Sequence, residues 1–137
     1  MSLNINLKNR GFDLPTIANS VKSGITKSDG TNLNYTDVAI ALWNSGYSID
    51  ARKLADLLWD QSADQKQIGQ AMKYLGLSLE TIADSVKRGI TNTDGTGLND
   101  IDVAIALWNS GHSFNARKLA DLLWDEGAKP LHRGLFT

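Results

Sequence analysis

The chain carries one segment twice. Residues 12–60 and 77–125 align without gaps at an offset of 65 positions, and 36 of the 49 aligned residues are identical. Each half has about 60 residues, a size at which a separate hydrophobic core is marginal. We therefore expect two units that pack on each other, with a first repeat at residues 1–61, a second repeat at 62–126 and an extended C-terminal tail at 127–137.

The stretch DVAIALWNSG, which occurs unchanged at residues 37–46 and 102–111, predicts a buried helix. Val38, Leu42 and Trp43 fall at helical spacing on one face, and the neighbouring isoleucine and alanines widen that face until little of the helix is polar. A helix that is apolar nearly all round needs neighbours on several sides. We therefore expect this helix at the centre of each unit, with its tryptophan turned inward.

The positions that flank the apolar segments keep the residue class that a helix boundary requires. Residues with a side-chain oxygen, which are favoured at helix N-caps, precede each segment; they are Asp13 and Ser78, Asn34 and Asn99, and Asp50 and Asn115. Glycines follow where the helices should end; they are Gly24, Gly89, Gly46 and Gly111. By analogy with residues 65–76, residues 3–10 are predicted to form a short helix, and Ser62 with Gln65 has the form of a capping box.

These patterns predict an all-α fold. We expect a tandem duplication of a three- to four-helix unit, made of αα-hairpins and packed as one compact bundle or as a short solenoid. The leucines of the last helix in each unit should face the core; they are Leu54, Leu57 and Leu58, and Leu119, Leu122 and Leu123.

The composition is that of a soluble globular protein. Hydrophobic residues make up 42% of the chain, and no run approaches the roughly 18 apolar residues of a membrane span. A signal-peptide pattern and cysteines are both absent from the sequence, so we expect a cytoplasmic protein that does not contact a membrane. An origin in a phage or virion is compatible with the same features. The net charge is −1, and neither half carries a basic excess that would attract nucleic-acid phosphate.

Each unit contains an Asp-Gly loop. In the second copy this loop resembles the calcium loop of dockerins and EF-hands, in which oxygen ligands alternate around a glycine; the matching residues are Asn92, Asp94, Gly95, Asn99 and Asp102. Ile90 stands at the first ligand position, where isoleucine cannot bind calcium. A tight turn followed by a helix N-cap accounts for the same residues. We therefore expect no metal and no cofactor.

The segment AIALWNSGYSIDARKLADLL resembles a helix-turn-helix motif, and its two copies could meet two half-sites on DNA. Arg52 and Arg117 would then lie at the start of the recognition helices. Asp56 and Asp121 share those helices, where carboxylates would repel phosphate.

A second local resemblance is to peptidoglycan-binding three-helix domains. Those domains carry an Asp-Gly loop, then an Ala-aliphatic pair and an aromatic-amide pair on the following helix. In this chain the matching residues are Asp94-Gly95, Ala104-Ile105 and Trp108-Asn109, with Asp29-Gly30, Ala39-Ile40 and Trp43-Asn44 in the first copy. The Phe-Gly-x-x-Thr segment of that family is missing here. The resemblance implies a helical module that binds cell-wall material.

No arrangement of residues in the sequence predicts catalysis. His112 is replaced by Tyr47 in the other copy, and His132 lies in the tail; no serine or acid is placed to work with either histidine. The tryptophans are expected in the core and between hairpins rather than stacked on sugars or bases. We therefore expect a protein that is not an enzyme.

The leading interpretation is a non-enzymatic interaction or structural module with two near-identical repeats, and DNA binding and peptidoglycan binding are the alternatives. Two equivalent surfaces on one scaffold could bind with a gain in avidity. The partner is expected to be another macromolecule, with a protein preferred over DNA, and the oligomeric state stays open. Polar residues unchanged between the copies form the candidate surface; they are Lys22, Thr31, Asn44, Arg52, Lys53, Lys87, Thr96, Asn109, Arg117 and Lys118.

Overall fold

The regular secondary structure is helical throughout residues 3–128, the part of the chain that the computed structural model describes. Apart from one antiparallel bridge between Thr26 and Asn32, these residues form no strand. Their helices are α1 (Leu3–Asn9), α2 (Leu14–Gly24), α3 (Tyr35–Trp43), α4 (Ala51–Asp60), α5 (Gln65–Tyr74), α6 (Leu79–Gly89), α7 (Asp100–Trp108) and α8 (Ala116–Asp125). The all-α prediction is confirmed for the described residues. Most of the predicted tail, residues 129–137 with His132, lies outside them.

Side-chain caps begin each helix from α2 to α8. At each start a side-chain oxygen accepts the backbone N–H three residues further on, which satisfies one of the unpaired donors of the first turn; the capping residues are Asp13, Asn34, Asp50, Asp64, Ser78, Asn99 and Asn115. The capping box predicted at Ser62 is wrong. Asp64 and Gln67 form that box instead, and Ser62 has a φ of 72° in the preceding turn.

The predicted central helices are α3 and α7. Helix α3 contacts α1, α2, α4 and α5, and α7 contacts α5, α6 and α8. Val38 and Val103 are fully buried at equivalent positions of the two helices. Gly46 and Gly111 follow the two helices with φ values of 95° and 101°, in the left-handed region that glycine adopts most easily.

Three helices of the second half repeat the bounds of three helices in the first half. Helices α6, α7 and α8 begin and end 65 residues after α2, α3 and α4. The first helix of each half differs, because α1 has 7 residues and α5 has 10. Within the described residues, no helix combines the length and the apolar composition that a membrane crossing requires.

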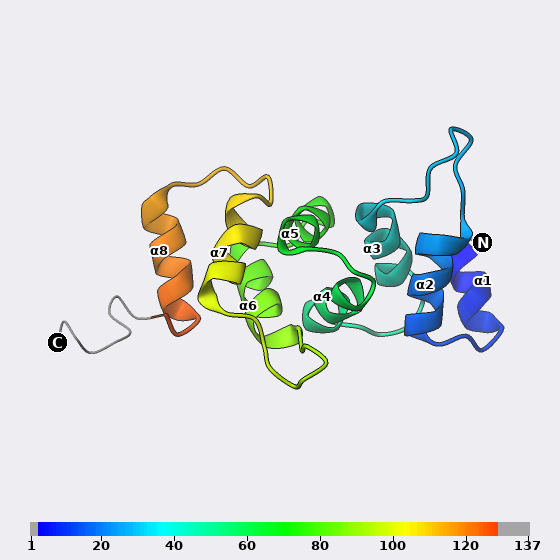
Figure 1. Ribbon diagram of the computed structural model, residues 1–137, viewed down its shortest axis with the longest axis horizontal. Coiled ribbons are helices and arrows are strands. Elements are labelled where there is room, and N and C mark those ends of the chain that lie inside the picture. Colours follow the sequence, from blue (N-terminus) through cyan, green and yellow to red (C-terminus); the bar gives the residue numbers. More distant parts are fainter. Residues whose placement is uncertain (1–2, 129–137) are drawn as a thin grey trace.

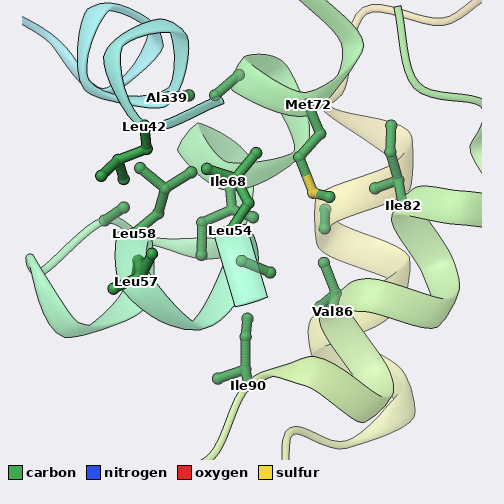
Figure 2. Packing of buried hydrophobic residues seen from close by; sticks show 14 of the residues in the cluster. Ala39, Leu42, Leu54, Leu57, Leu58, Ile68, Met72, Ile82, Val86 and Ile90 are labelled. Atoms are coloured by element: carbon green, nitrogen blue, oxygen red, sulfur yellow. The ribbon is translucent and has the colours of Figure 1, made fainter. Parts of the chain in front are cut away.

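The helices follow one another along the long axis of the molecule, from α1 and α2 at one end to α8 at the other (Figure 1). Figure 2 shows the middle of the core, where Leu42 of α3, Leu54 of α4 and Ile68 of α5 lie close together. Met72 of α5 continues the cluster toward Ile82 of α6. The buried cluster thus crosses the boundary between the two halves. Helix α4 makes its most extensive contact with α6, which belongs to the other half.

The inward placement predicted for the tryptophans is wrong for two of them. Trp108 and Trp124 are 54% and 52% exposed, whereas Trp43 and Trp59 at the equivalent positions are partly buried. The physical reason lies in the neighbours. Helices α5 and α6 pack on α3 and α4, but no helix of the described residues follows α8.

Candidate functional site

The contact between α4 and α6 shows how this chain joins one helical layer to the next. Gly89, the last residue of α6, lies directly against the backbone of Arg52 in α4. A methyl group added at Gly89 would stand 2.6 Å from both the Cα and the carbonyl oxygen of Arg52, closer than non-bonded atoms can approach. The absence of a side chain at Gly89 therefore sets the distance between the two helices.

Charged side chains bridge the same contact. The Arg52 guanidinium donates two hydrogen bonds to Asp84, from Nε to Oδ2 and from Nη2 to Oδ1, both at 2.9 Å. Arg88 of α6 makes ion pairs with Asp84 of the same helix at 3.4 Å and with Glu126, which follows α8, at 3.0 Å. Hydrogen bonding to Arg52 lowers the pKa of Asp84. The carboxylate of Asp84 therefore stays ionised well below neutral pH.

Two further bonds extend the contact toward the end of α4. The backbone N–H of Thr91 donates to Oδ1 of Asp56 at 3.1 Å, and the indole Nε1 of Trp59 donates to Oδ1 of Asn92 at 3.1 Å. Beneath these bonds the apolar side chains of α4 are closed off from solvent; Leu54, Ala55 and Leu58 are each 0% exposed. A second helix with the sequence of α4 could form the same hydrogen bonds and apolar contacts.

Helix α8 is such a helix, because its sequence, ARKLADLLWD, is identical to that of α4. In α8 the apolar face is open. Ala120 and Trp124 are exposed, and Leu119 and Leu123 are only partly buried. Of the α8 leucines predicted to face the core, only Leu122 is fully buried.

Helix α7, which packs against α8, also has exposed apolar side chains. Ile101 and Trp108, seven residues apart on the helix, are 70% and 54% exposed. Trp108 packs edge-on against Phe114, with ring centroids 5.3 Å apart. We call the combined surface the end face; its residues are Ile101, Trp108, Leu119, Ala120, Leu123 and Trp124. The sequence predicts the tryptophans and leucines among them in the core; they are exposed or partly buried because no further helix of residues 3–128 packs on α8 from this side.

The polar residues predicted to form a binding surface divide into two groups. Four of them make hydrogen bonds within their own loop or helix end. The hydroxyls of Thr31 and Thr96 each donate to an aspartate two residues earlier at 2.6 Å, and the amides of Asn44 and Asn109 donate to backbone oxygens of α3 and α7 at 3.0 and 2.8 Å. These bonds hold the Asp-Gly loops and the helix ends.

Most of the cations in that predicted set contact partners within the chain. Lys22 lies over the ring of Tyr35, 5.0 Å from its centroid, and Lys87 Nζ lies 3.3 Å from Asp100. Lys118 Nζ donates to Glu80 at 2.7 Å. The last three members of the set are exposed; they are Arg52, Lys53 and Arg117. Arg52 lies at the contact between α4 and α6, and Arg117 lies at the equivalent position of α8, beside the end face.

The side chain of His112 has a structural contact. Its Nε2 lies 3.0 Å from the carbonyl oxygen of Leu77, and the Tyr47 hydroxyl donates to the carbonyl oxygen of Phe12 at 2.6 Å. Phe12 and Leu77 are equivalent positions, as are Tyr47 and His112. Two different residues therefore tie the same pair of segments together in the two halves.

The Asp-Gly loops form tight turns. Gly30 and Gly95 both have a φ of 89°, and the residue after each glycine is held by the loop aspartate. Among residues 3–128, no three histidine, cysteine, aspartate or glutamate side chains are grouped so that they could hold a metal ion.

A groove of about 510 Å³ lies beside the contact between α4 and α6. Its lining includes Glu80 and Asp84, which are engaged by Lys118 and Arg52 respectively. The third carboxylate of the groove, that of Asp50, caps α4 by accepting the backbone N–H of Lys53. The groove is open to solvent, and each of its carboxylates is engaged in holding the helices. No protein-family model, no curated protein and no solved structure matches this chain.

Proposed function

We propose that the chain is a non-enzymatic interaction module in which two copies of one helical unit stack as a short solenoid, and that it binds a protein partner through the end face. The observation that carries this proposal is the exposure of α8 beside the burial of α4. One sequence of ten residues binds a helix in the middle of the molecule, whereas at the end of the molecule its Ala120 and Trp124 are exposed and Leu119 and Leu123 are only partly buried.

The end face has the composition of a protein-binding surface. Two tryptophans, two leucines and an isoleucine lie in it, and Arg117 and Asp121 are exposed at its edge. Aromatic residues and arginine are enriched at the centres of protein interfaces, and groups of exposed apolar side chains mark interaction sites.

The form of the partner follows from α6, which covers the equivalent surface of α4. That helix presents a small residue, Gly89, to the backbone and a carboxylate, Asp84, to the arginine. We therefore expect the partner to offer an amphipathic helix with a small residue where it crosses α8, laid along the face as in other helix-in-groove complexes.

A photoreactive amino acid placed at position 120 tests this proposal in cells that express the full chain. Ala120 is exposed within the end face, so a bound partner should be captured in a discrete crosslinked product. Lys66 of α5 is exposed outside that face and is the matched control position. Capture at both positions, or at neither, would show that the end face is not a docking surface.

A further inference from the structure

Each end of the molecule carries a counterpart of one of the two helices that meet in the contact between α4 and α6, which we call the central contact. One half is the sequence of α4, which recurs as α8. The other half is α6, LETIADSVKRG, and α2 at the opposite end reads LPTIANSVKSG. We propose that the end face of one molecule binds α2 of a second copy of this chain, in the way that α4 binds α6, so that molecules associate head to tail. This inference rests on the proposed function and names its partner.

The first support is a glycine on α2. Gly24 stands at the position equivalent to Gly89, and within the described residues no atom lies within 4 Å of a methyl group added there. The C-terminal end of α2, where Gly24 has no side chain, is therefore exposed. Docking as in the central contact would bring Gly24 against the backbone of Arg117, which has the place in α8 that Arg52 has in α4.

The second support is the apolar residue that follows. Ile90 comes directly after α6 and is 1% exposed beneath the central contact, whereas its equivalent Ile25 is only half-buried. The end face offers Leu119 and Leu123 at the positions of Leu54 and Leu58. Burial of apolar side chains from both molecules is the dominant favourable contribution to such an association.

Two of the three polar contacts at the edge can form in the same docking. Asn19 replaces Asp84, and its amide oxygen can accept a hydrogen bond from Arg117. Lys27 replaces Asn92 and cannot accept a hydrogen bond from an indole N–H, so the bond from Trp59 to Asn92 has no counterpart in this docking. The carboxylate of Asp121 would accept from the backbone N–H of Thr26, as Asp56 does from Thr91.

Association is expected to be weaker than the central contact, because Asn19 stands where that contact has Asp84, and the ion pair with the arginine is lost. The two surfaces are different from each other, so the contact does not close on itself. Open chains should form, and their mean length should rise with protein concentration.

Sedimentation velocity of the full chain tests the inference. The mean mass should rise as the concentration increases from about 10 μM to about 1 mM, the range in which weak protein contacts are populated. Gly24→Ala should weaken association at least about tenfold, since an added methyl group would overlap the partner backbone. Ala120→Arg should do the same from the other side.

A mixture of the two variants gives the sharpest outcome. Each variant keeps one intact surface, so the Gly24→Ala end face can still receive α2 of the Ala120→Arg chain. The mixture should form dimers and nothing longer, while each variant alone stays monomeric. Circular dichroism and Tm control for folding, which both variants should retain because Gly24 and Ala120 are exposed.

A wild-type chain that stays monomeric up to 1 mM, or variants that associate as the wild type does, would overturn the inference. Capture of a different protein, or of residues 129–137 of the same chain, at position 120 would also overturn it. A different protein captured there would leave the proposed function standing. No capture at all at position 120 would overturn both the inference and the proposed function.

Discussion

The guanidinium of Arg52 and the carboxylate of Asp84, 32 residues apart in sequence, form a two-point hydrogen-bonded ion pair with both N–O distances at 2.9 Å. This pair joins the two halves of the chain. Arg117 has the same position in a helix of identical sequence, and no helix of the described residues packs on that side of it. This difference between the two arginines supports the proposal that the end face binds a partner outside the chain.

Replacing Asp84 by asparagine should lower Tm by up to a few degrees at pH 7, because the charge-assisted bonds to Arg52 and Arg88 are weakened. The effect should be small, since both partners are substantially exposed and solvent screens the pair. The Arg52 hydrogen bonds lower the pKa of Asp84 in the folded state. The ionised carboxylate therefore stabilises the fold above its unfolded pKa of about 3.9, and this contribution is lost as pH falls through the folded pKa.

Thermal unfolding of wild type and Asp84→Asn across pH 2–7 measures this dependence. The two Tm values should converge as the solution is acidified. An Arg52→Gln background is the control, because in it the substitution at position 84 should have less effect at pH 7. A Tm difference that persists undiminished at the lowest pH would contradict the assignment to this ion pair.

Leucines at equivalent positions of α4 and α8 should contribute different amounts to the free energy of unfolding. Leu54→Ala should destabilise the protein by about 2–5 kcal/mol, the usual cost of a cavity at a fully buried leucine. Leu119→Ala should cost about half of that or less, because Leu119 is only partly buried. Denaturant unfolding of the two variants at low protein concentration gives both values. Equal losses would contradict the exposure of α8.

Gly89→Ala should destabilise the fold by about 1–3 kcal/mol or more, because the new methyl group would overlap the Arg52 backbone and separate α4 from α6. Gly24→Ala is the matched control in a dilute, monomeric sample. It should leave stability unchanged or raise it by about 0.5–1 kcal/mol, since alanine favours the helix more than glycine does. Chemical denaturation compares them. A Gly89→Ala protein as stable as wild type would show that the two helices do not touch at this residue.

Asn99→Ala should cost about 1 kcal/mol, because the side chain of Asn99 caps α7 by accepting the backbone N–H of Asp102 at 2.9 Å. Asn115→Asp is the control, since the equivalent helix α4 begins at Asp50 with the same type of bond. That variant should retain wild-type stability in the same unfolding experiment. A cost at Asn115→Asp as large as that at Asn99→Ala would show that the cap chemistry has been misassigned.

Helix positions could be predicted from the sequence because capping is local. Asn34 and Asn99 lie within four residues of the groups they cap, so the short segment around each contains the whole interaction. The N-cap of α5 was misplaced by two residues because Ser62 and Asp64 are both capping residues followed by a glutamine at the required spacing. The backbone distinguishes them, since Ser62 adopts a positive φ.

The candidate site could not be predicted in the same way. Exposure depends on what packs outside a helix, and α4 and α8 are identical in sequence, so no property of either helix alone separates Leu54 from Leu119. The bond between Arg52 and Asp84 likewise depends on the register between two helices. Sequence identity between the halves predicted the same helices in both. It could not show that, in the described residues, no helix packs on α8 as α6 packs on α4.

Cysteine trapping tests head-to-tail docking most directly, because the chain has no cysteine of its own. Asp56 and Thr91 are hydrogen-bonded across the central contact, so an Asp56→Cys/Thr91→Cys chain should close an internal disulfide and serves as the positive control. The equivalent pair across two molecules is Asp121 and Thr26. A mixture of Asp121→Cys and Thr26→Cys chains should form a mixed disulfide faster than Asp121→Cys mixed with Lys66→Cys. Equal rates for the two mixtures, while the internal control closes, would contradict the docking of α2 on the end face.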